Sequence, residues 1–234
     1  MILKDKIFRL PREWSNQELR QFGHLFEGRV INVSGWKDLD KEGNKYRDYF
    51  PNCSEYIVSN HPEKGKGFQN RPNEIMIDLE KDLRTNLQEQ FDVVINHTTL
   101  EHLFNVRKAF ENLCALTKDI IIIIVPFMQM GHGSGFEDYW RFTPECLKQA
   151  FKINGLDILY INYNDHKRTS VYIFSIASKK SEKWKNIITQ PEFNRKKVSI
   201  NTYYNRIGSR AIINGLLFRI KNKILSYFKK DIYY

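Results

Sequence analysis

Residues 91–144 read FDVVINHTTLEHLFNVRKAFENLCALTKDIIIIIVPFMQMGHGSGFEDYWRFTP, and this stretch decides the fold. Residues 91–96 are a short run of β-favouring residues, and residues 120–125 are five isoleucines followed by a valine. Uninterrupted apolar runs are typical of strands buried on both faces, as in parallel sheets. Apolar side chains recur at roughly helical spacing between the two runs, at Phe104, Val106, Ala109, Phe110, Leu113 and Leu116. The stretch therefore predicts a strand–helix–strand crossover.

Turn and capping signals predict further elements on both sides of this crossover. Ser15 followed by Glu18 has the spacing of a capping box and predicts a helix over residues 15–26. Thr143 before Pro144 predicts a helix that begins there, because threonine caps free amides and proline fits the first helical position. Strands are expected at residues 29–34, 55–59, 74–78, 156–163 and 170–178, the last two as an antiparallel hairpin.

Two loops follow the buried strands, at the edge where open α/β sheets bind their ligands. They carry LEH at 100–102, VPF at 125–127, His132, and DYWRFTP at 138–144. This combination resembles class I S-adenosylmethionine-dependent methyltransferases, and within them a subgroup often found among bacterial cell-surface polysaccharide genes. The resemblance covers roughly residues 29–178. It implies a Rossmann-like, mostly parallel sheet with helices on both faces and a terminal antiparallel hairpin, and S-adenosyl-L-methionine as the cofactor.

The resemblance also implies which residues contact that cofactor. A glycine-rich turn after the first strand corresponds to Ser34 and Gly35, although only one glycine is present and Trp36 follows it. At the end of the second strand the family has an acidic residue that accepts bonds from the ribose hydroxyls, whereas this chain has Asn60. The remaining expected cofactor contacts are Asp78 and Leu79 after the third strand, and His97, Thr98 and Glu101 after the fourth. Asp78 as a simple cap and Glu101 as a helix-dipole partner are the alternatives.

Methyl transfer to a sugar hydroxyl needs a base, and histidine suits that task near neutral pH. His132 lies between glycines after the fifth strand and is the expected base; the alternative is a turn histidine without a role. Asp138 is the second expected catalytic residue. The expected contacts to the acceptor are His102, Tyr139, Trp140 and Arg141, of which the last three, with Asp138, have the alternative role of fastening the loop. No metal is expected, because His97, His102 and His132 lack a recognised ligand spacing.

The positive charge is concentrated in one part of the chain. The net charge is +10, and residues 179–234 contain 14 basic and 3 acidic side chains, whereas residues 1–178 are nearly balanced. We therefore divide the chain into a methyltransferase-like domain, 1–178, and a basic linker with an amphipathic helix, 179–234. Residues 211–230 have an apolar face flanked by lysines and arginines. Three destinations remain open for this helix: an anionic membrane surface, its own core or a dimer partner, and, less favoured, nucleic acid.

The cysteines and the hydropathy bear on location. Three cysteines without paired spacing indicate neither a disulfide framework nor a zinc site, and the default is a reducing cytoplasm. The start of the chain has no apolar core of a signal peptide, and no apolar run approaches the ~20 residues of a membrane-spanning helix. A cytoplasmic protein, peripheral on the inner face of the membrane, is expected.

The function most favoured by the sequence is O-methylation of a sugar of a surface polysaccharide or a lipid-linked glycan. One rival is a methyltransferase-like fold without catalysis that binds or scaffolds glycosyltransferases, which the lone Gly35 and Asn60 favour. A second rival is a nucleic-acid methyltransferase that uses the basic tail. It is disfavoured because the chain lacks an Asn/Asp-Pro-Pro-aromatic motif.

Overall fold

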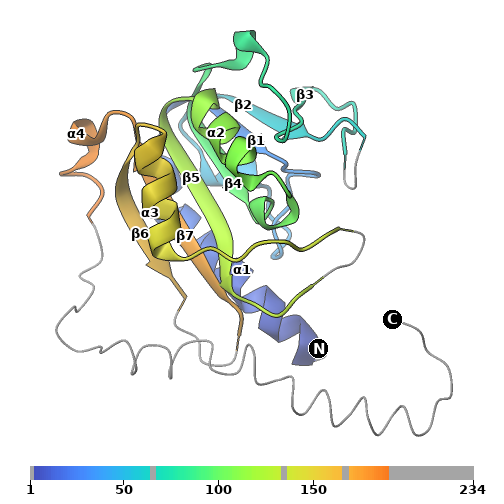
Figure 1. The fold of residues 1–234 in the computed structure, drawn as a ribbon. Coiled ribbons are helices and arrows are strands. Elements are labelled where there is room, and N and C mark those ends of the chain that lie inside the picture. The colour runs from blue at the N-terminus through green and yellow to red at the C-terminus, as the bar shows by residue number, and fades with distance from the viewer. Residues whose placement is uncertain (1–2, 64–66, 133–135, 165–168, 190–234) are drawn as a thin grey trace, which may run out of the picture.

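The structure is a computed structural model that describes residues 3–63, 67–132, 136–164 and 169–189. Seven strands form one sheet in the order β3-β2-β1-β4-β5-β7-β6 (Figure 1). The strands are β1 (Gly28–Val33), β2 (Cys53–Asn60), β3 (Glu74–Met76), β4 (Phe91–His97), β5 (Thr117–Met128), β6 (Asp157–Tyr163) and β7 (Val171–Ser178). The helices are α1 (Leu3–Phe22), α2 (Val106–Leu116), α3 (Pro144–Ile153) and α4 (Ser181–Trp184), with 3-10 turns η1 (Gly23–Leu25), η2 (Tyr46–Tyr49), η3 (Thr85–Leu87) and η4 (Leu100–His102).

The sheet is parallel except for β7. β1 pairs in parallel with both β2 and β4, and β5 continues the parallel set beside β4. β7 lies between β5 and β6 and runs antiparallel to both. The expected mostly parallel sheet with a terminal antiparallel hairpin is therefore confirmed. Strand order reverses between β1 and β4, and such a switch point opens a crevice at the carboxyl ends of the strands.

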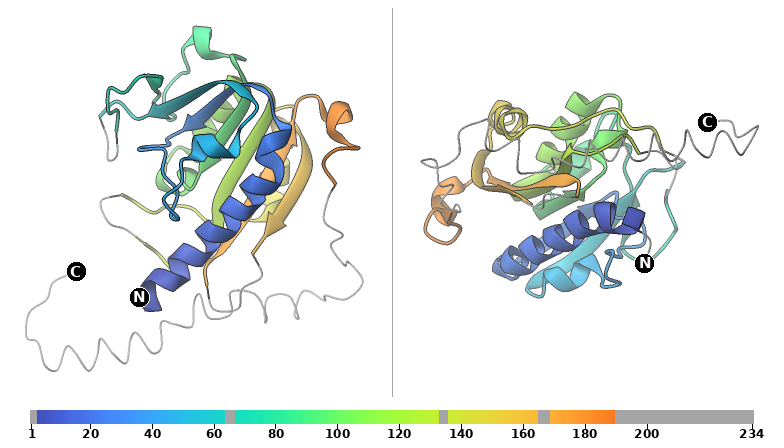
Figure 2. Two further views of the ribbon diagram at one scale, coloured as in Figure 1. Left: turned by 180° about the vertical axis from the view of Figure 1, so that it is seen from behind. Right: turned by 90° about the horizontal axis from the view of Figure 1, so that it is seen from below.

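Helices cover both faces of the sheet, as Figure 2 shows in the view from below. On one face α1 packs through Leu19 and Phe22 against a core that includes Phe174 of β7. On the other face α2 and α3 pack through side chains such as Leu113 and Phe151. The central strand β5 is covered on both sides, so its isoleucines are almost fully buried. Residues 120–125 are all apolar because both faces of β5 are buried.

The first helix differs from the expectation. It begins at Leu3, includes Pro11, and ends at Phe22, so the predicted start at Ser15 is wrong. Ser15 lies inside the helix, where its hydroxyl donates to the Arg12 carbonyl at 2.8 Å. Glu18 accepts a hydrogen bond at 2.6 Å from the hydroxyl of Tyr160 in β6. Both polar side chains of the expected capping box are therefore used inside the fold rather than at a helix end.

The connection between β1 and β2 has no α-helix. Residues 34–52 join these strands with only the 3-10 turn η2. The helix that begins at Thr143 is confirmed, because the Thr143 hydroxyl accepts from the Cys146 amide at 3.1 Å. No helix among the described residues is long and apolar enough to cross a membrane.

The folded part continues past residue 178. Trp184 of α4 is buried, stacks edge-on against Phe26 and donates to the Asp119 carboxylate at 3.0 Å. Ile188 is buried as well, so the start of the expected linker belongs to the domain's core. The expected amphipathic helix at 211–230 lies outside the described residues.

Candidate functional site

The switch point between β1 and β4 is bridged by one buried amide. Asn96, near the end of β4, donates from Nδ2 to the Val33 carbonyl of β1 at 3.0 Å. Its Oδ1 has no hydrogen-bond partner among the described residues, and neither has the buried hydroxyl of Ser59, near the end of β2. Buried polar atoms are nearly always paired in folded proteins. These two acceptors therefore mark the carboxyl edge as a place where a ligand can complete the hydrogen bonding.

The turn after β1 keeps an unusual backbone although it has a single glycine. Ser34 and Trp36 have φ angles of 60° and 47°, in the left-handed region that favours glycine. Gly35 lies between them, and a β-carbon there would stand 2.5 Å from the Asn32 side chain. The turn thus combines two strained residues with one position where only glycine fits.

Asn60 lies at the end of β2, as expected, but its amide is already bonded within the protein. Its Oδ1 accepts from the Trp36 backbone N–H at 2.7 Å, and its Nδ2 donates to the Trp36 carbonyl at 3.2 Å and to Glu74. Asn60 therefore clamps the turn after β1. As positioned, it offers less to a ribose than the acidic residue that the resemblance implies.

Asp78 lies beyond β3 and is held by neighbouring side chains. Its carboxylate is 3.4 Å from His61 Nε2 and 3.4 Å from Lys81 Nζ, and it accepts from the Glu80 amide at 3.0 Å. Burial alone would raise the pKa of Asp78, but these hydrogen bonds and charges outweigh it and lower the pKa. Leu79 is buried, and its carbonyl accepts from Asn112 of α2 at 2.9 Å. The bond to Glu80 closes a turn, and no helix begins there, so Asp78 is not the helix cap that the sequence offered as an alternative.

His97 faces the first helix. Arg12 lies 3.1 Å from His97 Nδ1, and because a guanidinium only donates, Nδ1 must accept and Nε2 must carry the hydrogen. That hydrogen points to the Ser15 hydroxyl at 2.8 Å. Burial, and after it the charge of Arg12, hold the pKa of His97 well below its usual range, so the ring is neutral. The next residue, Thr98, is buried with a φ of 50°, which is rare for a β-branched residue.

Glu101 is fully buried in the 3-10 turn after β4. Neither oxygen of its carboxylate has a hydrogen-bond partner among the described residues. Its backbone carbonyl, in contrast, accepts from the amides of Tyr139 and Trp140, which joins the two loops. Burial raises the pKa of Glu101 to about 7, although the charges of Arg12 and Arg141 act in the opposite direction.

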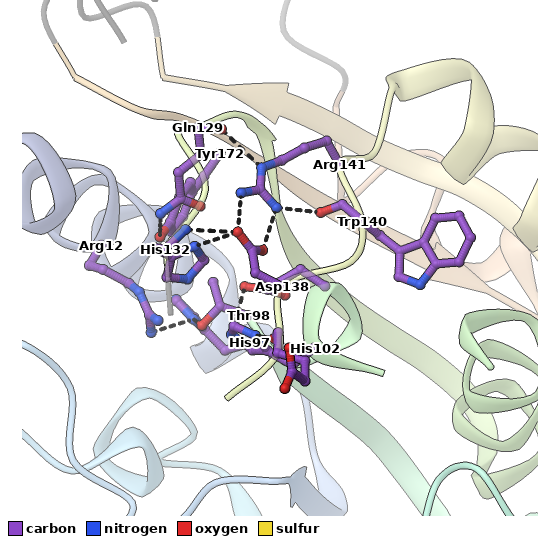
Figure 3. A network of polar contacts seen from close by, with 12 residues as sticks. Arg12, His97, Thr98, His102, Gln129, His132, Asp138, Trp140, Arg141 and Tyr172 are labelled. Carbon is purple, nitrogen blue, oxygen red and sulfur yellow. Dashed lines mark hydrogen bonds and ion pairs between the residues drawn. The ribbon is translucent and has the colours of Figure 1, made fainter. Parts of the chain in front are cut away.

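His132 and Asp138 lie together after β5 (Figure 3). The Asp138 carboxylate accepts from the His132 amide at 2.8 Å and lies 3.4 Å from its Nδ1. Burial opposes the charged form of Asp138, but hydrogen bonds from Arg141 and from His132 lower its pKa to about 2. Burial lowers the pKa of His132 more than the carboxylate raises it. At neutral pH the pair is therefore a carboxylate beside a neutral imidazole.

Arg141 fastens this loop. Its five N–H groups donate to the two oxygens of Asp138 and to the carbonyls of Gln129, Met130 and Trp140. These hydrogen bonds agree with the alternative role of fastening the loop, and acceptor binding by Arg141 stays a prediction. The Phe142 amide, which donates to the Pro126 carbonyl at 3.0 Å, ties the loop to β5 as well.

The other residues expected to contact the acceptor include exposed aromatic side chains. Tyr139 and Trp140 are 46% and 38% exposed, and Phe104, at 70%, stands edge-on to Tyr139 with ring centroids 5.3 Å apart. Trp140 is anchored through its indole N–H, which donates to the Leu103 carbonyl at 2.8 Å. His102 is joined to the same loop, 2.6 Å from the Glu137 carbonyl. Exposed ring faces beside a polar centre suit binding of a carbohydrate.

Two residues of the site lie outside every motif of the sequence. Arg12 of α1 contacts His97. The Cζ atom of Arg12 also lies over the ring of Tyr172 in β7, 5.8 Å from the ring centroid. Each is far along the chain from the loops after β4 and β5. Since no local spacing relates them to those loops, the sequence carried no signal for their participation.

A hollow of about 550 Å³ lies elsewhere, lined by Asp157, Leu159, Ser181 and Ile188 among others. Asp157 begins β6, which runs parallel to β5 on the far side of β7. The hollow is therefore at the amino ends of the parallel strands, opposite to the edge with the histidines. It is not part of the candidate site.

No family model matches the chain, and no curated protein matches its sequence. Solved structures do resemble it. One is the magnesium protoporphyrin IX methyltransferase from Synechocystis PCC 6803 with bound SAH, at 13% identity and a TM-score of 0.53, covering 76% of this chain and 88% of that chain. Another is an S-adenosylmethionine-dependent methyltransferase from Clostridium acetobutylicum ATCC 824, at 9% identity and a TM-score of 0.50, covering 76% and 94%. The chain therefore has the Rossmann-like fold of class I methyltransferases.

Proposed function

We propose that this chain is an S-adenosyl-L-methionine-dependent methyltransferase, and that its acceptor is a sugar hydroxyl of a cell-surface polysaccharide or a lipid-linked glycan. The observation that carries the proposal is the carboxyl edge of a methyltransferase fold on which a buried Asn96 acceptor and the His132–Asp138 pair converge. The two solved structures described above support the cofactor class, since one contains bound SAH.

The residues at the switch point fit the cofactor in part. Asn96 Oδ1 and the Ser59 hydroxyl lack partners within the described part of the chain, as expected where a ligand supplies the donors. At the turn after β1, Ser34 and Trp36 have the left-handed backbone conformation, and Gly35 between them has no side chain that could collide with a cofactor. The ribose position is the exception, because Asn60 already bonds Trp36 and Glu74. We propose that the cofactor lies beside this turn, where Asn96 and Ser59, rather than the Asn60 amide, offer side-chain hydrogen bonds to it.

The acceptor side uses the chain's own groups. When bound, the cofactor supplies a methyl group on a sulfonium, so transfer to a hydroxyl is a direct displacement. When no metal ion is bound at His132, its neutral imidazole takes up the proton of the acceptor hydroxyl. The Asp138 carboxylate holds the ring and stabilises the imidazolium that forms. The rings of Tyr139 and Trp140 support the sugar beside it. Arg141 keeps Asp138 ionised and the loop in place.

Titration calorimetry with S-adenosylmethionine, and separately with S-adenosylhomocysteine, tests this proposal. We expect binding in the micromolar range, about −8 kcal/mol. Gly35→Ala should weaken it at least about tenfold, because the added carbon meets Asn32 at 2.5 Å. Gly131→Ala is the matched control, since its added carbon meets only Asp138, at an ordinary 3.8 Å.

The same measurement distinguishes methyl transfer from the rival role, a methyltransferase-like fold that binds or scaffolds glycosyltransferases without catalysis. The observation that supports this rival is that the Asn60 amide, at the position where the resemblance expects a ribose contact, already bonds Trp36. Absence of heat with either compound, together with an unchanged melting temperature, would favour a binding role without catalysis. Gly35→Ala with parental affinity would instead leave methyl transfer open and remove the turn from the cofactor site.

We further propose that the protein works at the cytoplasmic face of a membrane, where lipid-linked glycans are assembled. The support is the sequence of residues 211–230, in which lysines and arginines flank an apolar face. Removal of residues 211–234 should release the protein from vesicles that contain anionic lipid. Undiminished sedimentation of the shortened chain with such vesicles would contradict this placement.

A further inference from the structure

Three possible metal ligands from two loops meet at the candidate site. Glu101 and His102 belong to the turn after β4, and His132 follows β5. One ligand atom from each lies within 4.8 Å of the others. The rings of the two histidines stand edge to face with centroids 5.2 Å apart. An ion among the three atoms would need only small side-chain adjustments to reach bonding distances of about 2.0–2.2 Å.

The Glu101 carboxylate of this group is buried, and its charge is not balanced by a hydrogen-bonded partner in the described part of the chain. Glu101 is fully buried and both of its oxygens are without a hydrogen-bond partner among the described residues. His102 Nε2 lies 3.8 Å from Oε1 of Glu101, beyond hydrogen-bonding distance. Two arginines lie nearby, but Arg141 is bonded to Asp138 and Arg12 to His97. A buried carboxylate is strongly disfavoured unless it is paired or binds a metal.

One ring nitrogen of each histidine faces an oxygen acceptor, as is usual around metal sites. His102 Nδ1 lies 2.6 Å from the Glu137 carbonyl, which can only accept, so Nδ1 donates and Nε2, the atom near Glu101, holds the lone pair. His132 Nδ1 lies beside the Asp138 carboxylate at 3.4 Å. Metal-binding histidines almost always donate their second ring nitrogen to a carbonyl or a carboxylate, which fixes the ring and its tautomer.

We infer that Glu101, His102 and His132 bind a divalent transition-metal ion. Two imidazoles and one carboxylate suit Zn²⁺, Co²⁺ or Fe²⁺ better than Mg²⁺ or Ca²⁺, which prefer oxygen ligands alone. Three protein ligands leave further coordination positions open, as in catalytic metal sites. The His132 side chain is 32% exposed, so the ion has a path from solvent.

An ion at this place would change the task of His132. A metal-bound oxygen loses its proton far more readily than a bulk hydroxyl, so the ion would activate the acceptor. His132 would then be a ligand, and proton uptake by the free imidazole would belong to the metal-free protein. Metal binding itself does not depend on the proposed methyl transfer, because the ligands and their supporting bonds belong to this chain alone.

Metal binding can be measured on the full chain after treatment with EDTA and dialysis. Co²⁺ is titrated first, followed by visible absorption, and Zn²⁺ then competes for the site. We expect one ion per chain, with nitrogen ligands visible in the Co²⁺ spectrum. Glu101→Gln and His102→Gln should each weaken binding at least about tenfold, since each removes one of three ligands. Two matched controls, Glu18→Gln at a distant buried carboxylate and His24→Gln at an exposed histidine, should keep the parental affinity.

The inference is overturned if the parent chain takes up no Co²⁺ or Zn²⁺. It is also overturned if Glu101→Gln and His102→Gln bind the ions as tightly as the parent. If Glu101→Gln leaves metal binding unchanged but weakens S-adenosylmethionine binding, Glu101 faces the cofactor instead. Calorimetry with the cofactor in EDTA is run in parallel, so failure of the metal site and failure of the proposed function give different results.

Discussion

The loop after β1 and the loops after β4 and β5 end at the same edge of the sheet but satisfy their polar groups in opposite ways. In the first loop, Asn60 bonds both backbone groups of Trp36, so the turn is closed upon itself. In the second pair of loops, Glu101 is buried without a hydrogen-bond partner among the described residues. Where polar groups bond one another, the protein alone satisfies their hydrogen bonding. Where buried polar groups are left unpaired, a ligand is expected to complete the hydrogen bonding.

The largest expected effect comes from Glu101, the group that makes the second region incomplete. Its pKa is about 7 in the folded protein against 4.5 when unperturbed. The folded state therefore holds an extra proton between these values, and stability falls as the pH rises through that window. Glu101→Gln removes this titration. Its free energy of unfolding relative to that of the parent should therefore rise by about 2.5 kcal/mol between about pH 5 and about pH 8.

Urea unfolding in EDTA at both pH values measures this difference. Glu63→Gln, at an exposed glutamate, is the matched control and should follow the parent. Parallel pH curves for Glu101→Gln and the parent would mean that Glu101 has a partner in the folded protein, which would weaken the contrast between the two regions.

A smaller effect is expected from the clamp of the first region. Glu74 beside Asn60 has a side chain that is 1% exposed, and hydrogen bonds lower its pKa despite burial, which alone would raise it. Asn60→Asp introduces the acidic residue type of the resembled family but places two carboxylates together. We expect a loss of about 2 kcal/mol in the free energy of unfolding.

Asn60→Ala is the comparison for this variant, since it removes the same bonds without adding charge. It should lose about 1 kcal/mol. Should Asn60→Asp prove as stable as the parent and bind S-adenosylmethionine more tightly, the position would be an ordinary ribose site, and the first region would not be closed.

The smallest effect concerns the backbone of the same turn. Ser34 has a φ of 60°, and the left-handed conformation costs a side-chain-bearing residue about 1 kcal/mol. Ser34→Gly relieves that strain but loses entropy, so a net gain of about 0.5 kcal/mol is expected in chemical unfolding. Ser54→Gly, at an exposed position of β2, should instead lose about 0.5–1 kcal/mol. Equal losses at both positions would show that Ser34 is not strained.

The sequence predicted the parts of the fold that local patterns encode. The buried runs gave β4 and β5, and Thr143 before Pro144 gave the start of α3, where its hydroxyl accepts from Cys146. The start of α1 was missed because Pro11 lies inside the helix, where proline normally ends one.

The candidate site was predictable only in its loops. The histidines and Asp138 were identified by residue type and position after β4 and β5. The grouping of Glu101 with His102 and His132 was not, because their distance depends on how two loops meet rather than on sequence spacing. The use of Arg141 to fasten the loop likewise depends on carbonyls that no sequence pattern displays.

The contact between Arg12 and His97 limits how far the chain can be shortened. Any truncated form that starts at β1 would lose the guanidinium and the Ser15 hydroxyl that fix one ring tautomer of His97. It would also uncover Phe174 and its neighbours on the sheet face beneath α1, an apolar surface prone to self-association. A fusion partner or tag is therefore better attached through a spacer that leaves the first helix free to pack.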